Sequence, residues 1–146
     1  MVLQLSDFPE GWSLQQRSEK FSSDVDDQAR SLGWIEGYII TYKRGDTLLD
    51  ITLIYQSMSR YPIENVTKLL DLPILRPGEN LTVDNLTDPR IGDKSRAWRT
   101  KDGYVVSFHI EFVKRDIYEQ LTIGGTSGID YEFLKELAQK VESRIA

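Results

Sequence analysis

Residues 104–125, YVVSFHIEFVKRDIYEQLTIGG, carry the clearest periodicity in the chain. Apolar residues occupy every second position at the start of this segment, namely Tyr104, Val106, Phe108, Ile110 and Phe112. Because successive side chains of a strand point to opposite faces, the pattern predicts a strand with one apolar face. Residues 113–116 then predict a turn, and a return strand continues the apolar face with Ile117, Leu121 and Ile123, interrupted by Glu119. A hairpin alone is marginal in water, so this face requires a packing partner.

The C-terminal segment supplies that partner. Asp130 is suited to cap a helix that we expect to run from Tyr131 to Arg144. Its apolar residues fall on one stripe: Phe133, Leu134, Leu137, Ala138, Val141 and Ile145. Charged side chains take the opposite side, as in a helix that lies on a sheet. We therefore predict that the terminal helix packs on the hairpin.

The remaining elements follow from shorter patterns. Alternation and turn residues predict strands at 3–5, 12–21 (an edge strand), 34–43, 47–56 and 94–100, with turns at 43–46 and 101–103. Short helices are expected at 23–32, ending at Gly33, and at 62–71. Residues 72–90 show no period and predict an ordered surface loop with one short strand. Together these elements predict a single α+β domain over residues 1–146, with a mainly antiparallel sheet of roughly six strands flanked by helices.

Composition excludes several classes of function. The 146 residues carry 18 basic and 23 acidic side chains, a net charge of -5, which argues against a nucleic-acid partner. Cysteine is absent, so disulfides, thiolate metal sites and cysteine nucleophiles are excluded. No segment approaches the ~20 apolar residues that a membrane-spanning helix needs. We expect a monomer whose partner is a protein or a small apolar ligand.

Two cellular locations stay open. The N-terminal residues MVLQLSD lack a basic region followed by an apolar one, so the sequence shows no signal peptide. Sequons at Asn65, Asn80 and Asn85 suit an exported domain whose leader and lipid anchor lie upstream, although chance explains them equally well. The alternative is a cytoplasmic adaptor that docks a partner protein.

The order of strand, helix, hairpin, helix, loop, meander and terminal helix resembles the Mog1/PsbP-like fold. Two short motifs, Phe8–Trp12 (FPEGW) and Ile91–Ser95 (IGDKS), together with the central hairpin and terminal helix, are similar to uncharacterised extracytoplasmic lipoprotein-type domains of prokaryotes. The resemblance implies an α/β/α sandwich and a non-catalytic binding or accessory role. Members of the fold bind a small GTPase or assist a membrane complex. Their binding residues match no positions of this chain.

Catalytic and metal chemistry find little support in the sequence. His109 is the only histidine, so a hydrolase would have to use it with Glu111 or Glu119, and neither pair comes with a nucleophile. One histidine without cysteine leaves only carboxylates to hold a metal. The segment Gly124–Gly128 lies between a strand and a helix but lacks the lysine and spacing of a phosphate-binding loop. We predict no catalytic residue, no metal and no cofactor.

A candidate ligand groove follows from the second face of the central hairpin. That face is polar and carries Ser107, His109, Tyr118 and Gln120, together with Glu111 and Thr122. A polar set with one aromatic suits a wet groove better than a dry core. Residues 72–90 are long enough to fold over this face as a rim. The alternative is that the helix at 62–71 covers the face and leaves no groove.

Overall fold

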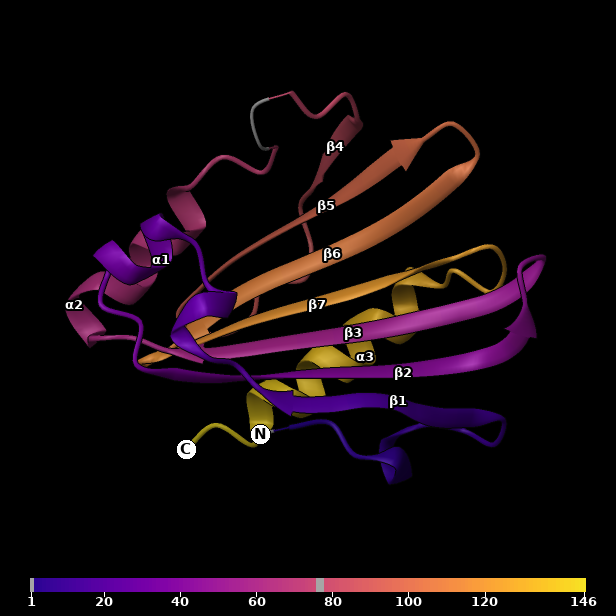
Figure 1. Cartoon of the computed structure of the whole chain (residues 1–146), viewed down its shortest axis with the longest axis horizontal. Helices are drawn as coiled ribbons and strands as arrows, with labels where there is room; N and C mark the ends of the chain where they lie inside the picture. Colours follow the sequence, from indigo (N-terminus) through magenta and orange to yellow (C-terminus); the bar gives the residue numbers. More distant parts are fainter. Residues whose placement is uncertain (1, 76–77) are drawn as a thin grey trace.

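The computed structural model describes residues 2–75 and 78–146 and contains a seven-stranded sheet in which every neighbouring pair is antiparallel (Figure 1). The strand order is β1-β2-β3-β7-β6-β5-β4. The strands are β1 (Trp12–Glu19), β2 (Glu36–Thr47), β3 (Asp50–Arg60), β4 (Thr82–Leu86), β5 (Lys94–Asp102), β6 (Val105–Lys114) and β7 (Ile117–Gly125). The α+β class and the mainly antiparallel sheet are therefore confirmed, with β7 in the middle of the sheet.

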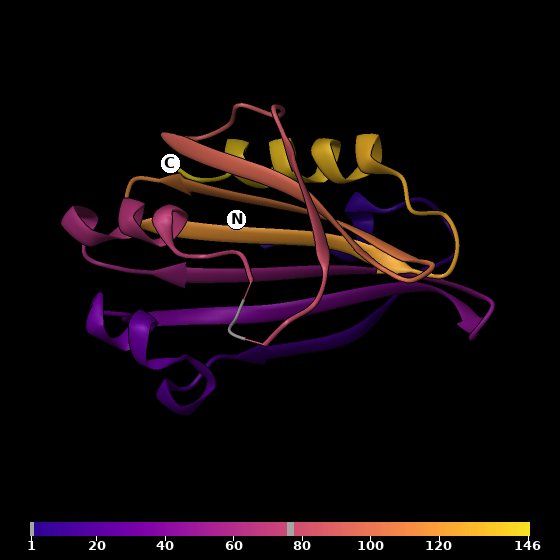
Figure 2. The ribbon, with the colours of Figure 1, turned by 90° about the horizontal axis from the view of Figure 1, so that it is seen from above.

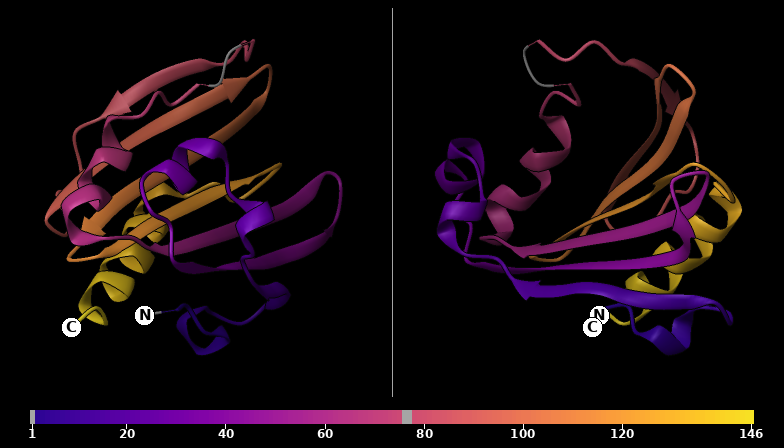
Figure 3. Two further views of the ribbon diagram at one scale, coloured as in Figure 1. Left: turned by 60° about the vertical axis from the view of Figure 1, so that its left-hand side comes forward. Right: turned by 45° about the vertical axis from the view of Figure 1, so that its right-hand side comes forward.

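Helices lie on both faces of the sheet, as Figures 2 and 3 show. The long helix α3 (Tyr131–Ser143) covers one side, which we call the α3 face. The short segments η2 (Ser22–Asp24), α1 (Asp27–Ser31), α2 (Ile63–Val66) and η3 (Thr67–Asp71) gather near one end of the strands on the other side, which we call the groove face. None of the described helices is long and apolar enough to cross a membrane.

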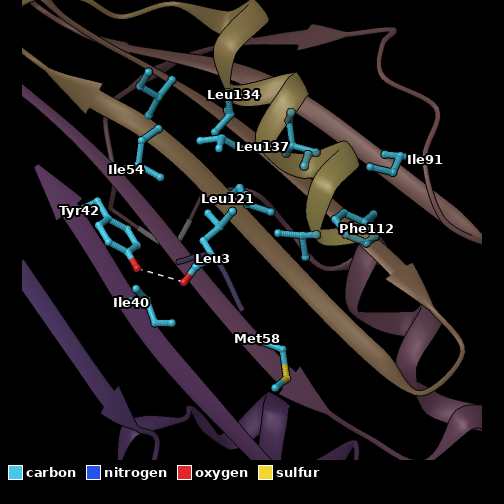
Figure 4. Packing of buried hydrophobic residues seen from close by; sticks show 14 of the residues in the cluster. Leu3, Ile40, Tyr42, Ile54, Met58, Ile91, Phe112, Leu121, Leu134 and Leu137 are labelled. Atoms are coloured by element: carbon cyan, nitrogen blue, oxygen red, sulfur yellow. Dashed lines mark hydrogen bonds between the residues drawn. The ribbon is translucent and has the colours of Figure 1, made fainter. Parts of the chain in front are cut away.

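The main core lies between α3 and the sheet (Figure 4). Leu134, Leu137, Ala138 and Val141 of α3 are fully buried. They pack with inward residues of four strands: Ile40, Ile54, Ile110, Phe112, Leu121 and Ile123. Burying side chains of this size stabilises the fold by about 1.5–3 kcal/mol each. The terminal helix thus packs on the central hairpin, as the sequence predicts.

The central hairpin is confirmed in register as well as in position. Phe108 pairs with Ile123 and Ile110 with Leu121, so the two apolar rows share the α3 face. The turn places Arg115 at a φ of 57°. Tyr104 does not belong to the row, because the two-residue turn that joins Asp102 to Val105 includes it and leaves its side chain fully exposed.

The predicted turn at residues 43–46 is wrong. Strand β2 runs through these residues to Thr47, and the chain reverses at Leu48 and Leu49. The register between β2 and β3 shifts between Arg44 and Thr47, which marks a bulge. Gly45 makes the bulge feasible, because its φ is +86° and a Cβ there would lie 2.0 Å from the carbonyl oxygen of Asp50.

The predicted opening strand is also wrong. Leu5–Asp7 forms a single 3₁₀ turn, η1, in which the Asp7 carboxylate accepts a hydrogen bond from the backbone N–H of Gln4 at 2.8 Å. This local bond offers the backbone an alternative to strand pairing. Leu3 is buried instead against the sheet, where its N–H donates to Gln56 Oε1 at 2.8 Å.

The remaining predicted elements need smaller corrections. The segment 23–32 divides into η2 and α1, and Asp26 caps α1 by accepting a hydrogen bond from Ala29 N at 2.8 Å. The helix at 62–71 divides into α2 and η3. The edge strand at 12–21, the strand at 94–100 and the short strand within 72–90 are present as β1, β5 and β4.

Candidate functional site

A groove with a volume of about 570 Å³ opens on the groove face of the sheet. Its floor is formed by side chains of β3, β7, β6 and β5, which alternate with the core residues of the α3 face. Segment η2 and helix α1 line one side, and Leu69 with residues 72–74 lines the other. The lining is mainly polar and includes Lys20, Ser57, Ser59, Arg96, Glu111 and Gln120.

An ion pair and a tyrosine organise the floor. Arg96 Nε donates to Glu111 Oε1 at 2.9 Å, and Arg96 Nη1 donates to the carbonyl oxygen of Leu72 at 2.7 Å. The hydroxyl of Tyr118 donates to the other oxygen of Glu111. Burial raises the pKa of Glu111, and the contacts with Tyr118 and Arg96 partly offset that rise. The guanidinium of Arg96 also lies over the ring of Trp98, 5.3 Å from its centroid.

The structure places two of the four predicted groove residues in the lining. Tyr118 and Gln120 lie side by side on β7, with the Tyr118 hydroxyl 3.4 Å from Gln120 Oε1. Ser107 lies further along β6, where its Oγ would be 2.8 Å from a Cβ at Gly124. His109 is half-buried on the same face and stacks on Trp98, which lines the groove, with ring centroids 5.1 Å apart.

Both ring nitrogens of His109 have hydroxyl partners. Nε2 is 2.9 Å from Thr100 Oγ1, and Nδ1 is 3.0 Å from Thr122 Oγ1. Burial lowers the pKa of His109 to about 4, so the ring is neutral at pH 7. The neutral ring is thus held on the groove face between two threonine hydroxyls and the ring of Trp98.

Glu119 lies on the α3 face, away from His109. It is fully buried, and Gln56 Nε2 donates to its Oε2 at 3.0 Å. Burial raises the pKa of Glu119 to about 8. Because His109 and Glu119 project from opposite faces of one sheet, they share no site.

Part of the expected rim at residues 72–90 lines the groove, and the segment at 62–71 covers part of the same face. Leu72, Pro73 and Ile74 line the groove, while residues 76–77 of the predicted rim lie outside the described residues. Helices α2 and η3 cover the end of the face: Val66, Leu69 and Leu70 form a second apolar cluster with Ala29, Tyr61 and Val113, against which Tyr118 packs. The groove therefore lies beside this cluster.

Lys20 and Arg96 are lining residues that the sequence does not single out. Lys20 follows the exposed edge strand, where a lysine normally points to water. Arg96 and Trp98 alternate with the buried Ala97 on β5, so their period-2 spacing signals the face that they share with His109. Trp34 precedes β2 and packs on the groove side, where its Nε1 donates to Ser59 Oγ at 3.2 Å.

Over residues 2–75 and 78–146, no group of three or more acidic or histidine side chains is placed to hold a metal ion. Comparisons of the chain with protein-family models, with curated proteins and with solved structures found no match.

Proposed function

We propose that this chain is a non-catalytic binding domain of an exported or cell-surface lipoprotein, and that it binds a small polar ligand in the groove. The observation that carries the proposal is the groove of about 570 Å³, a size typical of small-molecule sites. The resemblance to Mog1/PsbP-like domains supports an accessory role, and helices on both faces of an antiparallel sheet are compatible with that sandwich. Two of its sequons, Asn80 and Asn85, are exposed, as export with glycosylation requires.

The lining of the groove favours a polar ligand over the small apolar ligand expected from the sequence. Serine, glutamine, lysine, arginine and carboxylate side chains reach the groove from several elements. An apolar ligand would bury these groups without partners, at a cost of about 1–3 kcal/mol for each group. A polar ligand replaces the water on them.

The arrangement of His109 favours binding over hydrolysis. A general base works best with a pKa near the operating pH, but burial lowers the pKa of His109 to about 4. Glu111 is engaged by Arg96 and Tyr118, and Glu119 projects from the other face. The hydrolase alternative thus has the least support of the three.

A second candidate, a cytoplasmic adaptor that docks a partner protein, rests on a different observation. Two hairpin tips carry bulky apolar side chains that are almost fully exposed: Leu48 and Leu49 between β2 and β3, and Tyr104 between β5 and β6. Figures 1 and 2 show both tips at the same end of the sheet. Exposed apolar groups of this kind favour a protein interface.

Tryptophan indole signals in NMR spectra test the groove directly. The chain has three tryptophans: Trp98 lines the groove, Trp34 contacts it through Ser59, and Trp12 lies in the core on the α3 face. A screen of small polar compounds should shift the signals of Trp98 and Trp34 and leave that of Trp12 in place. The variant Gln120→Phe, which fills the groove, should abolish the shifts, whereas Gln139→Phe on the exposed side of α3 should retain them.

The proposal is overturned if no compound shifts the indole signals of Trp98 or Trp34, or if the Gln120→Phe variant binds as tightly as the wild type. The adaptor alternative predicts that a captured partner depends on Leu48, Leu49 and Tyr104 and is indifferent to Gln120. The exported assignment predicts a lipid-modified cysteine upstream of this domain in the mature protein, which mass spectrometry of the native protein would detect.

A further inference from the structure

Lys20 reaches the groove by an unusual route. It follows β1 at the edge of the sheet, and its backbone N–H donates to the carbonyl oxygen of Gly37 at 2.8 Å. From there its side chain passes over Gly37 on β2 to reach β3. A Cβ at position 37 would lie 3.1 Å from Lys20 Cδ and 2.9 Å from Ser59 Oγ. The absence of a side chain at Gly37 therefore opens the path along which the lysine crosses a whole strand.

The ammonium group ends on two serine hydroxyls of β3. Lys20 Nζ donates to Ser57 Oγ and, at 2.9 Å, to Ser59 Oγ. Ser57 and Ser59 are themselves buried, and all three residues line the groove. An ammonium has three N–H donors, so two bonds to serine leave one for a ligand. No carboxylate of the described chain lies within salt-bridge distance of Lys20 Nζ.

The other charged groups of the groove already have partners. Arg96 and Glu111 pair with each other. Asp24 Oδ2 accepts from Phe21 N at 2.6 Å, and Asp26 Oδ1 caps α1. Burial lowers the pKa of Lys20 to about 8, and the nearby carboxylate of Asp24 opposes that shift only in part. At pH 7 the amine is still charged, and no ion pair among the described residues includes it.

We propose that Lys20 binds the carboxylate group of a small organic acid in this groove, with Ser57 and Ser59 holding the ammonium in place. The inference rests on the proposed function, because it names the ligand class of the same groove. A carboxylate supplies the countercharge that a partly buried ammonium lacks, and charge-assisted bonds of this kind are about twice as strong as neutral ones.

A monocarboxylate fits the local charges better than a phosphate. A phosphate group carries up to two negative charges and is usually met by several cations or by a set of backbone N–H groups. Here one ammonium without an ion-pair partner would face the anion, and Asp24, Asp26 and Glu111 also line the groove. A second negative charge on the ligand would be repelled by these carboxylates.

The test compares propanoate with propanamide, which has nearly the same shape without the charge, and with inorganic phosphate. Each is titrated into the protein at pH 7 while the indole signals of Trp34, Trp98 and Trp12 are followed by NMR. We expect propanoate to shift Trp34 and Trp98 at concentrations at least ten-fold lower than propanamide or phosphate. Trp12 should not move, because it lies on the opposite side of the sheet.

Variants then locate the effect. Lys20→Met should weaken propanoate binding at least ten-fold and leave propanamide unaffected, and Lys68→Met, a surface lysine bonded to Asn65, should change neither. Lys20→Gln serves the same purpose if Lys20→Met does not fold. Equal binding of propanoate and propanamide, tighter binding of phosphate, or full propanoate binding by the Lys20 variants would each overturn the assignment.

Failure of this inference is distinguishable from failure of the proposed function. If neutral polar compounds shift Trp34 and Trp98 and Gln120→Phe abolishes the shifts, the groove binds ligands even though Lys20 does not select acids. If neither neutral nor acidic compounds shift these two signals, the binding function itself is refuted.

Discussion

Glu119 is a buried acid in the main core. Its side chain is fully buried on the α3 face, and its Oε1 has no hydrogen-bond partner among residues 2–75 and 78–146. Gln56 donates to the other oxygen at 3.0 Å. A carboxylate in such a place is costly to ionise, and burial accordingly raises the pKa of Glu119 from 4.5 to about 8. The group is therefore protonated in the folded protein at pH 7 and ionised in the unfolded chain.

The first prediction is a change in the pH dependence of stability on Glu119→Gln. Between pH 4.5 and about 8 the folded state holds a proton that the unfolded state has lost, so the free energy of unfolding falls as pH rises through this window. The neutral amide removes that loss. At pH 7 the variant should be more stable than the wild type by on the order of 3 kcal/mol, and near pH 4 the two should match. Urea unfolding at both pH values measures the difference.

Glu132→Gln on the exposed side of α3 is the matched control, and its stability should change by less than about 0.5 kcal/mol at either pH. A constant difference between Glu119→Gln and the wild type across pH 4–8 would show that Glu119 does not hold the extra proton.

The second prediction concerns His109. Because burial lowers the pKa of His109 to about 4, its ring C2–H signal should stay in place from pH 8 to pH 5 and move only as pH approaches 4. The unfolded chain takes up the proton near pH 6.5. The titration of His109 therefore lowers the free energy of unfolding as pH falls from about 6.5 to about 4. A proton NMR titration measures the midpoint. A midpoint near 6.5 would mean an exposed ring and would reopen the hydrolase alternative.

At the scale of single elements, α3 is the helix on which the main core depends. Leu137 is fully buried at the centre of its apolar stripe. The third prediction is that Leu137→Ala lowers the free energy of unfolding by about 2–5 kcal/mol, because it removes buried methyl groups and leaves a cavity. Gln139→Ala, on the exposed side of the same helix, should cost less than about 0.5 kcal/mol. Chemical denaturation compares the two, and equal effects would contradict the packing.

The elements that the sequence predicts well are those with a repeated signal. The central hairpin and α3 show unbroken alternation or helical spacing over many residues, so one misplaced residue such as Tyr104 does not alter the prediction. The elements that it misses depend on one local event. Gly45, within the segment 43–46, favours a turn in the sequence. In the structure its positive φ forms a bulge, and β2 continues beyond it. Leu5 reads as strand, yet the Asp7 side chain closes a 3₁₀ turn.

From the sequence, only the face of the sheet that carries the groove can be predicted, and the position of the opening on that face cannot. Alternation along β6 and β7 identifies the polar side that holds Tyr118 and Gln120, and the structure adds where on this side the helices leave an opening. Lys20 was not predictable, because its position in the groove depends on a side chain crossing β2 at Gly37. Neither residue carries a periodic signal, and the pairing of distant strands brings them together.

At the scale of the whole molecule, one sheet carries two apolar clusters. The larger cluster lies under α3, and the smaller one, with Val66, Leu69 and Leu70, lies on the groove face. Adjacent residues of β6 belong to different clusters: Phe112 faces α3 and Val113 faces η3. The two clusters therefore share the same strands. Unfolding of such a strand would remove residues from both clusters at once.

The fourth prediction is that both faces unfold in one transition. Two-state unfolding is the norm for single domains of this size, and the shared strands give its structural reason here. Trp12 reports on the α3 face, and Trp34, packed beside Ala29 and Tyr61, reports on the groove face. In a urea titration followed by NMR, the native indole signals of Trp12 and Trp34 should disappear with the same midpoint, which should also match the midpoint from circular dichroism. Earlier loss of the Trp34 signal, while Trp12 stays native, would mean that α1, α2 and η3 open separately. In that case the segments that line the groove would unfold locally while the sheet stays folded.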